Sequence, residues 1–319
     1  MRILVAGAGG FIGGHLAGVL LAQGHDVRSV DRKDRADWHQ VHPEAENVVA
    51  DLNAPDAAAG AVSGCDRVFN MACDMGGMGF IESHKARCML SVLTNTHLIA
   101  AAVDAGVDRY FFASTACVYP QRLQDSTEVV ALREDDAYPA DPEDGYGWEK
   151  LFSERMCRHM AEDFGIDVRV ARFHNVYGPR GTWDGGREKA PAAICRKVAV
   201  AKATGNHEIE IWGDGEQRRS FLYIDDAIEG VLTLMESDVS DPVNIGSEEM
   251  VSINELVDAV SDIAGVTLRR SHDLSAPQGV RGRSSDNTMV RARLGWEPTI
   301  SLRDGLAPTY EWIAAHVTK

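Results

Sequence analysis

The stretch RILVAGAGGFIGGHL, residues 2–16, joins an apolar strand, a glycine-rich turn and the start of an apolar helix. Its glycines Gly7, Gly10 and Gly13 follow the spacing GxxGxxG. In such a junction the first glycine permits a tight turn, the second lets the backbone approach a pyrophosphate, and the third lets helix and strand pack closely. The helix N-terminus then faces the phosphates with its partial positive charge. The stretch therefore predicts a dinucleotide-binding βαβ unit.

The next predicted strand, HDVRSVD at residues 25–31, ends on a carboxylate. Asp31 lies 18 residues after Gly13, where a carboxylate accepts hydrogen bonds from the ribose hydroxyls of adenosine. The same charge repels a 2′-phosphate, so NAD is favoured over NADP. Arg32, directly after it, is the one neighbouring feature that would suit NADP. Asp51, at the end of a further predicted strand, is placed to meet the adenine edge.

Strand-like and helical segments alternate along the first 180 residues, which indicates an α/β protein with a doubly wound parallel (Rossmann) sheet. We expect strands at 2–8, 25–31, 46–52, 65–73, 108–115 and within 166–179, and helices at about 11–24, 86–105 and 146–163. Later helices are expected near 190–203, 225–236, 253–263 and 304–317, with a strand in EIEIWG. The predicted domains are an NAD-binding Rossmann domain at 1–174, with a return segment at about 218–246, and a smaller α/β nucleotide-sugar-binding domain at 175–217 and 247–319.

The net charge of −16, from 32 basic and 48 acidic residues, disfavours a nucleic-acid partner, which needs a basic face. Against this acidic background, three basic islands in the C-terminal half favour a bound polyanion. The islands are Arg187, Lys189, Arg196 and Lys197; Arg218 and Arg219; and Arg281 and Arg283.

Membrane insertion and metal binding are not expected. No run approaches the roughly 18–20 apolar residues that span a bilayer. The apolar N-terminus carries the glycine spacing, and no cleavage-type site follows it, so we expect a cytoplasmic protein. The six cysteines form neither a CxxC pair nor a metal-ligand cluster and are expected to be reduced, most of them in the core.

A redox pair is expected in DGYGWEKLFSE, where Tyr146 and Lys150 stand four apart on one helix face. A phenol, with a pKa near 10, is too weak a base at neutral pH, and a neighbouring ammonium favours its ionised form. Thr115, at a strand end, can hydrogen-bond the same substrate oxygen, so the three can move a proton while NAD takes a hydride. The predicted cofactor contacts are Gly7, Gly10, Phe11, Ile12, Gly13, Asp31, Asp51, Tyr146 and Lys150.

The motifs GAGGFIG, STACVYP, YGWEK and RFHNVYGPRGTW resemble the extended short-chain dehydrogenase/reductase family of nucleotide-sugar enzymes, across essentially the whole chain. Within that family, DMGGMGF, GGREKAPAAICRK, IWGDGEQRRSF and GVRGRSSDN are similar to the GDP-mannose 3,5-epimerases. The resemblance implies an isomerase that converts GDP-mannose to GDP-L-galactose, with GDP-L-gulose as a second product, through transient oxidation of carbon 4 by NAD. It also implies a homodimer through the helices near 86–105 and 146–163.

Cys117 discriminates among reactions. In the family's sugar dehydratases this position holds a glutamate, and in its 4-epimerases it usually holds a small or hydroxyl residue, so a thiol argues against both. The resemblance assigns Cys117 as base and Lys189 as acid for inversion at carbons 3 and 5. Their ordinary pKa values, about 8.5 and about 10.4, can be tuned by the surroundings, and Arg187 and the nicotinamide are expected to lower that of Lys189. By position alone, Cys117 could equally be an inert core residue.

The resemblance also implies the substrate contacts. The loop formed by Met75, Gly76 and Gly77, here called the glycine loop, would lie over the sugar together with Asn175. Lys197, Gln217, Arg219 and Arg283 would hold the diphosphate and nucleoside. The full set is Met75, Gly76, Gly77, Thr115, Ala116, Asn175, Glu188, Lys189, Ala190, Lys197, Gln217, Arg219 and Arg283. Trp212 is expected in the core.

Two other functions stay open on the sequence. One is another NDP-hexose epimerase or dehydratase of the same fold, because neither the nucleotide base nor the inverted carbon follows from the residues. The other is a catalytically silent NAD-binding regulatory protein, against which the intact Thr115, Cys117, Tyr146, Lys150 and Lys189 count.

Overall fold

The computed structural model describes residues 1–276 and 278–317, and its larger part is a seven-stranded parallel sheet with the order β11-β6-β5-β4-β1-β2-β3. Its strands are β1 (Arg2–Ala6), β2 (Asp26–Asp31), β3 (Glu46–Val49), β4 (Arg67–Asn70), β5 (Arg109–Thr115), β6 (Asp167–Phe173) and β11 (Val243–Ile245). The predicted doubly wound Rossmann sheet is confirmed. The strand order reverses between β1 and β4, which is where ligands bind in open α/β sheets.

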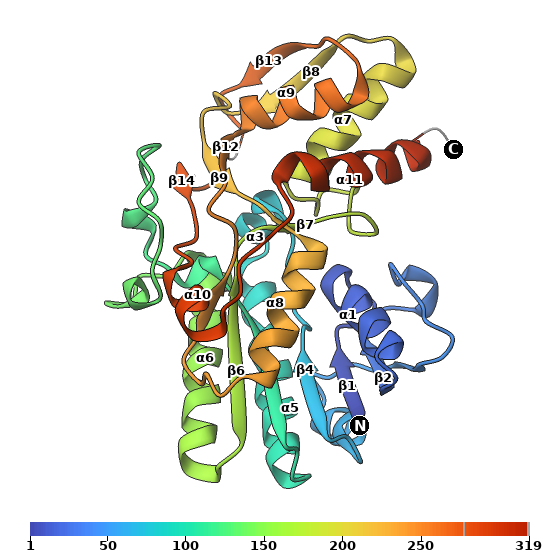
Figure 1. Cartoon of the computed structure of the whole chain (residues 1–319), viewed down its shortest axis with the longest axis vertical. Coiled ribbons are helices and arrows are strands. Elements are labelled where there is room, and N and C mark those ends of the chain that lie inside the picture. Colours follow the sequence, from blue (N-terminus) through green and yellow to red (C-terminus); the bar gives the residue numbers. More distant parts are fainter. Residues whose placement is uncertain (277, 318–319) are drawn as a thin grey trace.

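Helices cover both faces of the sheet (Figure 1). They are α1 (Phe11–Ala22), α2 (Pro55–Val62), α5 (Ser91–Asp104), α6 (Asp144–Phe164) and α8 (Ile224–Glu236). Alternate residues of β1 point to opposite faces, so Ile3 and Val5 pack with α1 and α8, whereas Leu4 and Ala6 pack with α2, α5 and α6. All four side chains are buried, which explains the unbroken apolar run that the sequence shows there.

A smaller part lies above the carboxyl ends of the main strands (Figure 1). Its helices are α7 (Ala190–Thr204), α9 (Ile253–Ala264) and α11 (Leu302–Val317). Its short strands are β8 (Glu208–Trp212) paired with β13 (Arg269–Asp273), β9 (Arg218–Ser220) paired with β12 (Met250–Ser252) and β14 (Gly282–Arg283), and β7 (Val176–Tyr177) paired with β10 (Leu222–Tyr223).

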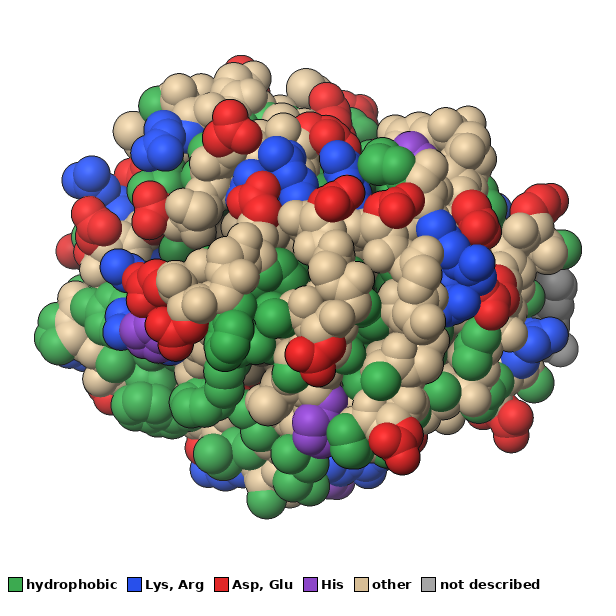
Figure 2. Space-filling view, turned by 90° about the horizontal axis from the view of Figure 1, so that it is seen from below, with side chains coloured by type: hydrophobic (Ala, Val, Ile, Leu, Met, Phe, Trp, Pro, Cys, Tyr) green, Lys and Arg blue, Asp and Glu red, His purple; other side chains and the backbone are tan. Residues whose placement is uncertain are grey.

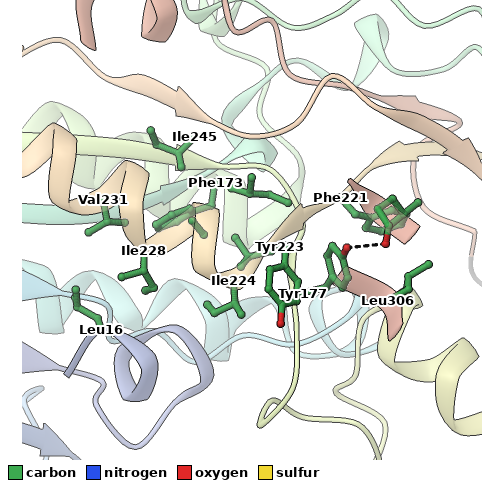
Figure 3. Close-up of a cluster of buried hydrophobic side chains, with 14 of the residues drawn as sticks. Leu16, Phe173, Tyr177, Phe221, Tyr223, Ile224, Ile228, Val231, Ile245 and Leu306 are labelled. Atoms are coloured by element: carbon green, nitrogen blue, oxygen red, sulfur yellow. Dashed lines mark hydrogen bonds between the residues drawn. The ribbon is translucent and has the colours of Figure 1, made fainter. Parts of the chain in front are cut away.

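One hydrophobic cluster connects the two parts. It runs from Leu16 of α1 past Ile228 of α8 and Phe173 of β6 to Leu306 of α11, as Figure 3 shows. Within the smaller part, the Tyr177 hydroxyl donates a hydrogen bond to the Leu302 carbonyl at 3.0 Å, which ties β7 to the start of α11. The domain boundaries drawn from the sequence stay a prediction, since this shared core gives no break in packing at which to test them.

The remaining elements are short and were not predicted as such. They are α3 (Met78–Ser83), α4 (Lys85–Met89), α10 (Thr288–Leu294) and the 3-10 helices Arg35–Asp37, Ala116–Val118 (η2), Gln121–Leu123 and Glu134–Ala137. The single helix expected at 86–105 is divided into α4 and α5. Among the described residues, Lys85–Asp104 is the one helical stretch long and apolar enough to cross a membrane by length and composition, a test that core helices also pass, and it packs along α6.

Candidate active site

A cavity of about 970 Å³ opens at the carboxyl ends of the central strands, where the strand order reverses. All nine predicted cofactor contacts line it, together with four of the predicted substrate contacts. The cofactor set is Gly7, Gly10, Phe11, Ile12, Gly13, Asp31, Asp51, Tyr146 and Lys150, and the substrate set is Met75, Gly76, Thr115 and Lys189. The structure therefore brings the dinucleotide motif, the redox pair and the predicted acid into one space.

The glycine turn fits a pyrophosphate. Gly7 has φ +82°, and a Cβ on Gly13 would lie 2.3 Å from the Gly7 carbonyl oxygen, so a side chain at either position would disrupt the turn. Gly10 begins α1, and within the described chain no side chain caps this helix end and no acidic residue stands in its first turn. The first amides of α1 are thus free to bind an anion, as the pyrophosphate of NAD requires.

Asp31, the predicted ribose contact, lines the cavity with no competing cation among its described neighbours. It is buried at the end of β2, and its Oδ1 accepts a hydrogen bond from the Lys33 amide at 3.0 Å. Arg32 turns instead to Asp74, with 2.7 Å between Nη2 and Oδ2. The Lys33 ammonium donates to the Gly9 carbonyl at 2.6 Å. Both cations beside Asp31 are therefore engaged elsewhere, which answers the question that Arg32 raised in the sequence.

Asp74 collects three arginines at the rim of the cavity. Besides Arg32, it accepts hydrogen bonds from Arg87 and, at 2.9 Å, from Arg187. Burial opposes its ionisation, but the three guanidinium groups outweigh burial and lower the pKa of Asp74. Arg187 also stacks over the Phe80 ring, 3.8 Å from its centroid. Sequence reasoning missed this cluster, because its members come from four separate segments.

Tyr146 and Lys150 lie on the buried face of α6, with the Lys150 Nζ 6.0 Å from the centre of the Tyr146 ring. Burial raises the pKa of Tyr146 well above its usual range, nearby Cys73 and Cys117 add to the rise, and a hydrogen bond with Thr115 opposes it. The Tyr146 pKa thus shifts upward in the protein alone, opposite to the direction that the sequence predicts from Lys150. Burial alone would lower the pKa of Lys150, but Cys73 and Glu149 raise it. The ammonium therefore interacts with these two groups as well as with the Tyr146 ring.

The turn after β5 is fastened to the start of α6. The Thr115 hydroxyl accepts a hydrogen bond from the Cys117 amide at 3.3 Å, which caps η2. The Glu143 amide donates to the Cys117 carbonyl at 2.9 Å. A Cβ on Gly147 would lie only 2.2 Å from that same carbonyl oxygen, so glycine lets α6 approach the turn. These contacts hold Thr115, Cys117 and Tyr146 in one neighbourhood.

Cys117 is 6% exposed and lies beside a buried ion pair. Arg283 points Nη1 at the sulfur, 3.4 Å away, and Nη2 at the Glu143 carboxylate, 2.6 Å away. Burial raises the pKa of the Cys117 thiol to about 11, Glu143 adds to the rise, and Arg283 opposes it. The thiol is thus moved away from neutrality, the opposite of the tuning expected from the sequence. Glu143 was not predicted, because sequence cannot tell which acid of DPEDG is buried.

Lys189 ends the loop before α7 and faces the same cavity. Burial lowers the pKa of its ammonium, the nearby Cys117 opposes the shift, and Arg283 adds to it. The direction matches the expectation, but the cation named for it, Arg187, is not the one that acts, and the expected effect of the nicotinamide stays a prediction. Arg187 is bound to Asp74, and Arg283 is the cation that acts on Lys189.

The glycine loop and the loop before α7 lie side by side. The Gly77 amide donates to the Arg187 carbonyl at 3.0 Å, and a Cβ on Gly77 would lie 2.5 Å from the Glu188 carbonyl oxygen. Glu188 turns its carboxylate to Arg196 at 2.8 Å and to the Gly186 amide at 2.7 Å. The two segments that resemble epimerases are therefore one structural unit, although about 110 residues separate them along the chain.

The other predicted substrate contacts lie outside the described lining of the cavity; they are Gly77, Ala116, Asn175, Glu188, Ala190, Lys197, Gln217, Arg219 and Arg283. Lys197 donates to the Glu210 carbonyl at 2.6 Å, Gln217 to the Trp212 carbonyl at 3.1 Å and Asn175 to the Ser220 carbonyl at 3.0 Å. Arg219 donates to two backbone carbonyls, and burial together with Arg283 lowers its pKa to about 9. Trp212 is 45% exposed, so its expected place in the core is wrong.

Residues 3–246 match the model of the NAD dependent epimerase/dehydratase family, and the chain belongs to that family. NAD is therefore its cofactor, as Asp31 and the glycine turn predict.

Within the family, the chain is 48% identical to GDP-mannose 3,5-epimerase 1 of Oryza sativa subsp. japonica and 46% identical to GDP-mannose 3,5-epimerase of Arabidopsis thaliana. These matches span 100% of this chain and 83% and 84% of those proteins. The resemblance drawn from the sequence and the class of NAD-dependent epimerase are thus confirmed.

Solved structures agree with the fold. UDP-glucose 4-epimerase of Thermotoga maritima with UDP-glucose superposes with a TM-score of 0.89 at 25% identity, over 99% of this chain and 100% of that one. UDP-glucuronic acid 4-epimerase of Bacillus cereus, with UDP-glucuronic acid and NAD, gives 0.84 at 26% identity, with the same coverage.

Proposed function

We propose that this protein epimerises GDP-mannose at carbons 3 and 5, giving GDP-L-galactose and GDP-L-gulose, by oxidising and re-reducing carbon 4 in each turnover. One observation carries the proposal: Lys189 lines the same cavity as the redox tyrosine, Tyr146, and the buried thiol of Cys117 lies on the turn that is fastened to the start of α6, beside Tyr146. The identity of 46–48% with proteins named GDP-mannose 3,5-epimerase supports this substrate.

Redox at carbon 4 needs a proton acceptor beside the sugar hydroxyl. NAD, when bound, supplies the reversible removal of hydride from that carbon. Tyr146 first loses its own proton to solvent, and as the phenolate it takes the hydroxyl proton. Thr115 orients the oxygen through its own hydroxyl, and the buried Lys150 keeps positive charge next to the ring, which favours the phenolate. A proton transfer of this kind contributes about 10²–10⁴ to the rate.

Once carbon 4 is a ketone, the protons on carbons 3 and 5 become acidic, because both carbons are alpha to the carbonyl. The Cys117 thiolate, formed when the thiol loses its proton to solvent, removes such a proton on one face of the ring and becomes a thiol. The Lys189 ammonium delivers a proton on the other face and becomes an amine, and both groups then exchange protons with solvent. Their environments push the two pKa values in directions that suit these roles. The thiol becomes a stronger base once ionised, and the ammonium becomes a readier acid.

Nuclear magnetic resonance of the products tests the proposal directly. Purified protein incubated with GDP-mannose is expected to give sugars inverted at carbon 5 alone and at carbons 3 and 5 together. A product inverted at carbon 4, or one that has lost water from carbon 6, would instead favour another epimerase or a dehydratase. No product, with NAD bound, would favour a silent NAD-binding protein.

We further propose a homodimer, in a cytoplasmic setting that suits six free thiols. Large apolar side chains on α4, α5 and α6 are 38–57% exposed, and they are Met89, Leu90, Leu93, Trp148 and Phe152. Figure 2 shows that apolar side chains gather over part of the lower surface. Exposed apolar surface of this kind marks a protein–protein contact.

A further inference from the structure

Arg32 directly follows Asp31 in the sequence, and this arginine would suit NADP as well as NAD. In Rossmann proteins an arginine near the end of the second strand accommodates the 2′-phosphate of NADP. Arg32 lines the same cavity as Asp31 and Asp51, and both carboxylates attract its guanidinium electrostatically. Arg32 is therefore close enough to the adenosine end of the site that something must keep it from a phosphate.

Asp74 holds Arg32 in place. The ion pair is 2.7 Å long, and the Asp74 side chain is 5% exposed, whereas that of Arg32 is 43% exposed. The backbone at Asp74 is itself fixed, because the Ser91 hydroxyl accepts a hydrogen bond from the Asp74 amide at 3.0 Å. Arg87 and Arg187 occupy the rest of the carboxylate. Asp74 therefore cannot follow Arg32 toward a new partner, and Arg32 would have to break the pair to reach a phosphate.

We propose that Asp74 is a specificity-determining residue that withholds Arg32 from the ribose 2′-position and so adds to the exclusion of NADP by Asp31. NADP is then excluded in two independent ways. Asp31 repels the 2′-phosphate, and Asp74 keeps Arg32 from binding it. Replacing Asp31 alone removes the repulsion but supplies no cation. Replacing both Asp31 and Asp74 frees Arg32 as well, so that the site can bind NADP.

The test is a cycle of variants titrated with both dinucleotides after the cofactor is stripped. Dissociation constants for NAD and NADP are measured by calorimetry for the wild type, D31A, D74N and D31A/D74N. We expect D31A to gain little NADP affinity, and D31A/D74N to bind NADP about ten- to a hundredfold more tightly than D31A does, because a freed guanidinium forms charge-assisted hydrogen bonds with phosphate. The ratio of the NAD and NADP dissociation constants is compared among the four proteins, so that a loss of affinity common to both dinucleotides cancels.

R32Q identifies the cation. Added to D31A/D74N, it is expected to cancel the gain, whereas R35Q, at an exposed arginine that donates to the Asn47 carbonyl, is the matched control and should leave the gain intact. A gain that survives R32Q would mean that another group, such as Lys33, binds the phosphate, and the proposal would be wrong. Equal NADP affinity in D31A and D31A/D74N would also overturn it.

A second comparison decides the matter if D74N does not fold, since Asp74 neutralises three arginines. D31A and D31A/R32Q keep Asp74. If Asp74 withholds Arg32, the two variants bind NADP equally. If D31A/R32Q binds NADP at least tenfold more weakly than D31A, Arg32 already reaches the phosphate and Asp74 does not withhold it.

Discussion

At the scale of single residues, the chemistry depends on groups whose burial opposes their charge. Burial raises the pKa of the Cys117 thiol to about 11, raises that of Tyr146 and lowers that of the Lys189 ammonium. Burial therefore disfavours the charged form of each of these three groups. Beside them, Arg283 and Glu143 form a buried ion pair, and the pKa of Lys150 is raised, which favours its ammonium.

Tyr146→Phe is expected to lower turnover by a factor of at least about 10² without unfolding the protein, because one oxygen is lost and the buried ring stays. Proton exchange at carbons 3 and 5 should vanish with it, since both require the ketone. Product resonances and a thermal melt measure the two quantities. Exchange that persists at the wild-type rate would show that oxidation does not run through Tyr146.

The rate of proton exchange should rise with pH. Because the thiol has a pKa of about 11, the thiolate fraction grows about tenfold per pH unit through the neutral range. Inversion should turn down again where Lys189 loses its proton, at a pH below its ordinary pKa of 10.5. The rate of solvent deuterium exchange is measured at each pH and divided by the fraction of reduced cofactor. This division removes the pH dependence of the oxidation step and leaves that of thiol ionisation. Exchange that is flat from about pH 6 to pH 9 would contradict a thiolate base.

At the scale of elements, the active geometry depends on how closely α6 approaches the turn after β5. The backbone bond from Glu143 to Cys117 and the absence of a side chain on Gly147 set this approach. Local patterns predicted both elements, because GxxGxxG, the alternating strands and the YxxxK spacing are all short-range signals. The approach itself was not predictable, since it is a tertiary contact.

Gly147→Ala tests this contact. A Cβ 2.2 Å from a backbone oxygen must push α6 away from the turn, so we expect a loss of about 1–3 kcal/mol in the free energy of unfolding and a larger proportional loss of activity. Chemical denaturation and steady-state rates measure these. Gly60→Ala in α2, where a Cβ meets nothing within 4 Å, is the control and should be neutral or stabilising. Equal behaviour of the two variants would contradict the account.

At the scale of the whole molecule, the features that the sequence did not predict are contacts between residues far apart along the chain. Arg283 lies 166 residues from Cys117, and Arg187 lies 113 residues from Asp74, yet these pairs decide the electrostatics of the site. The sequence predicted the fold, NAD, the nine cofactor contacts that line the cavity and four of its thirteen substrate contacts. It expected Arg187, two residues from Lys189 along the chain, to lower the pKa of Lys189. In the folded protein Arg187 binds Asp74, and Arg283 is the cation that lowers this pKa.

The exposed apolar face of α4, α5 and α6 predicts a dimer. Sedimentation should give twice the chain mass of 34.7 kDa for the wild type. Phe152→Glu, at a half-exposed position on α6, should shift the equilibrium toward the monomer by at least about tenfold, because a charge is depleted from interface cores. Glu162→Gln, on the exposed end of the same helix, is the control. A wild-type protein that sediments as a monomer at micromolar concentration would rule the dimer out.

The central claim is that Cys117 and Lys189 move protons at the two carbons beside a transient ketone, and isotope labelling in heavy water tests it most directly. Wild-type protein should place solvent deuterium on carbons 3 and 5 of the recovered nucleotide sugars. Cys117→Ser, whose hydroxyl is far less acidic, and Lys189→Met, which cannot transfer a proton, should each block inversion. Both should still bind NAD and show absorbance from the reduced cofactor when substrate is added. Near wild-type labelling and inversion by Cys117→Ser would make the thiol a packing residue and contradict the mechanism.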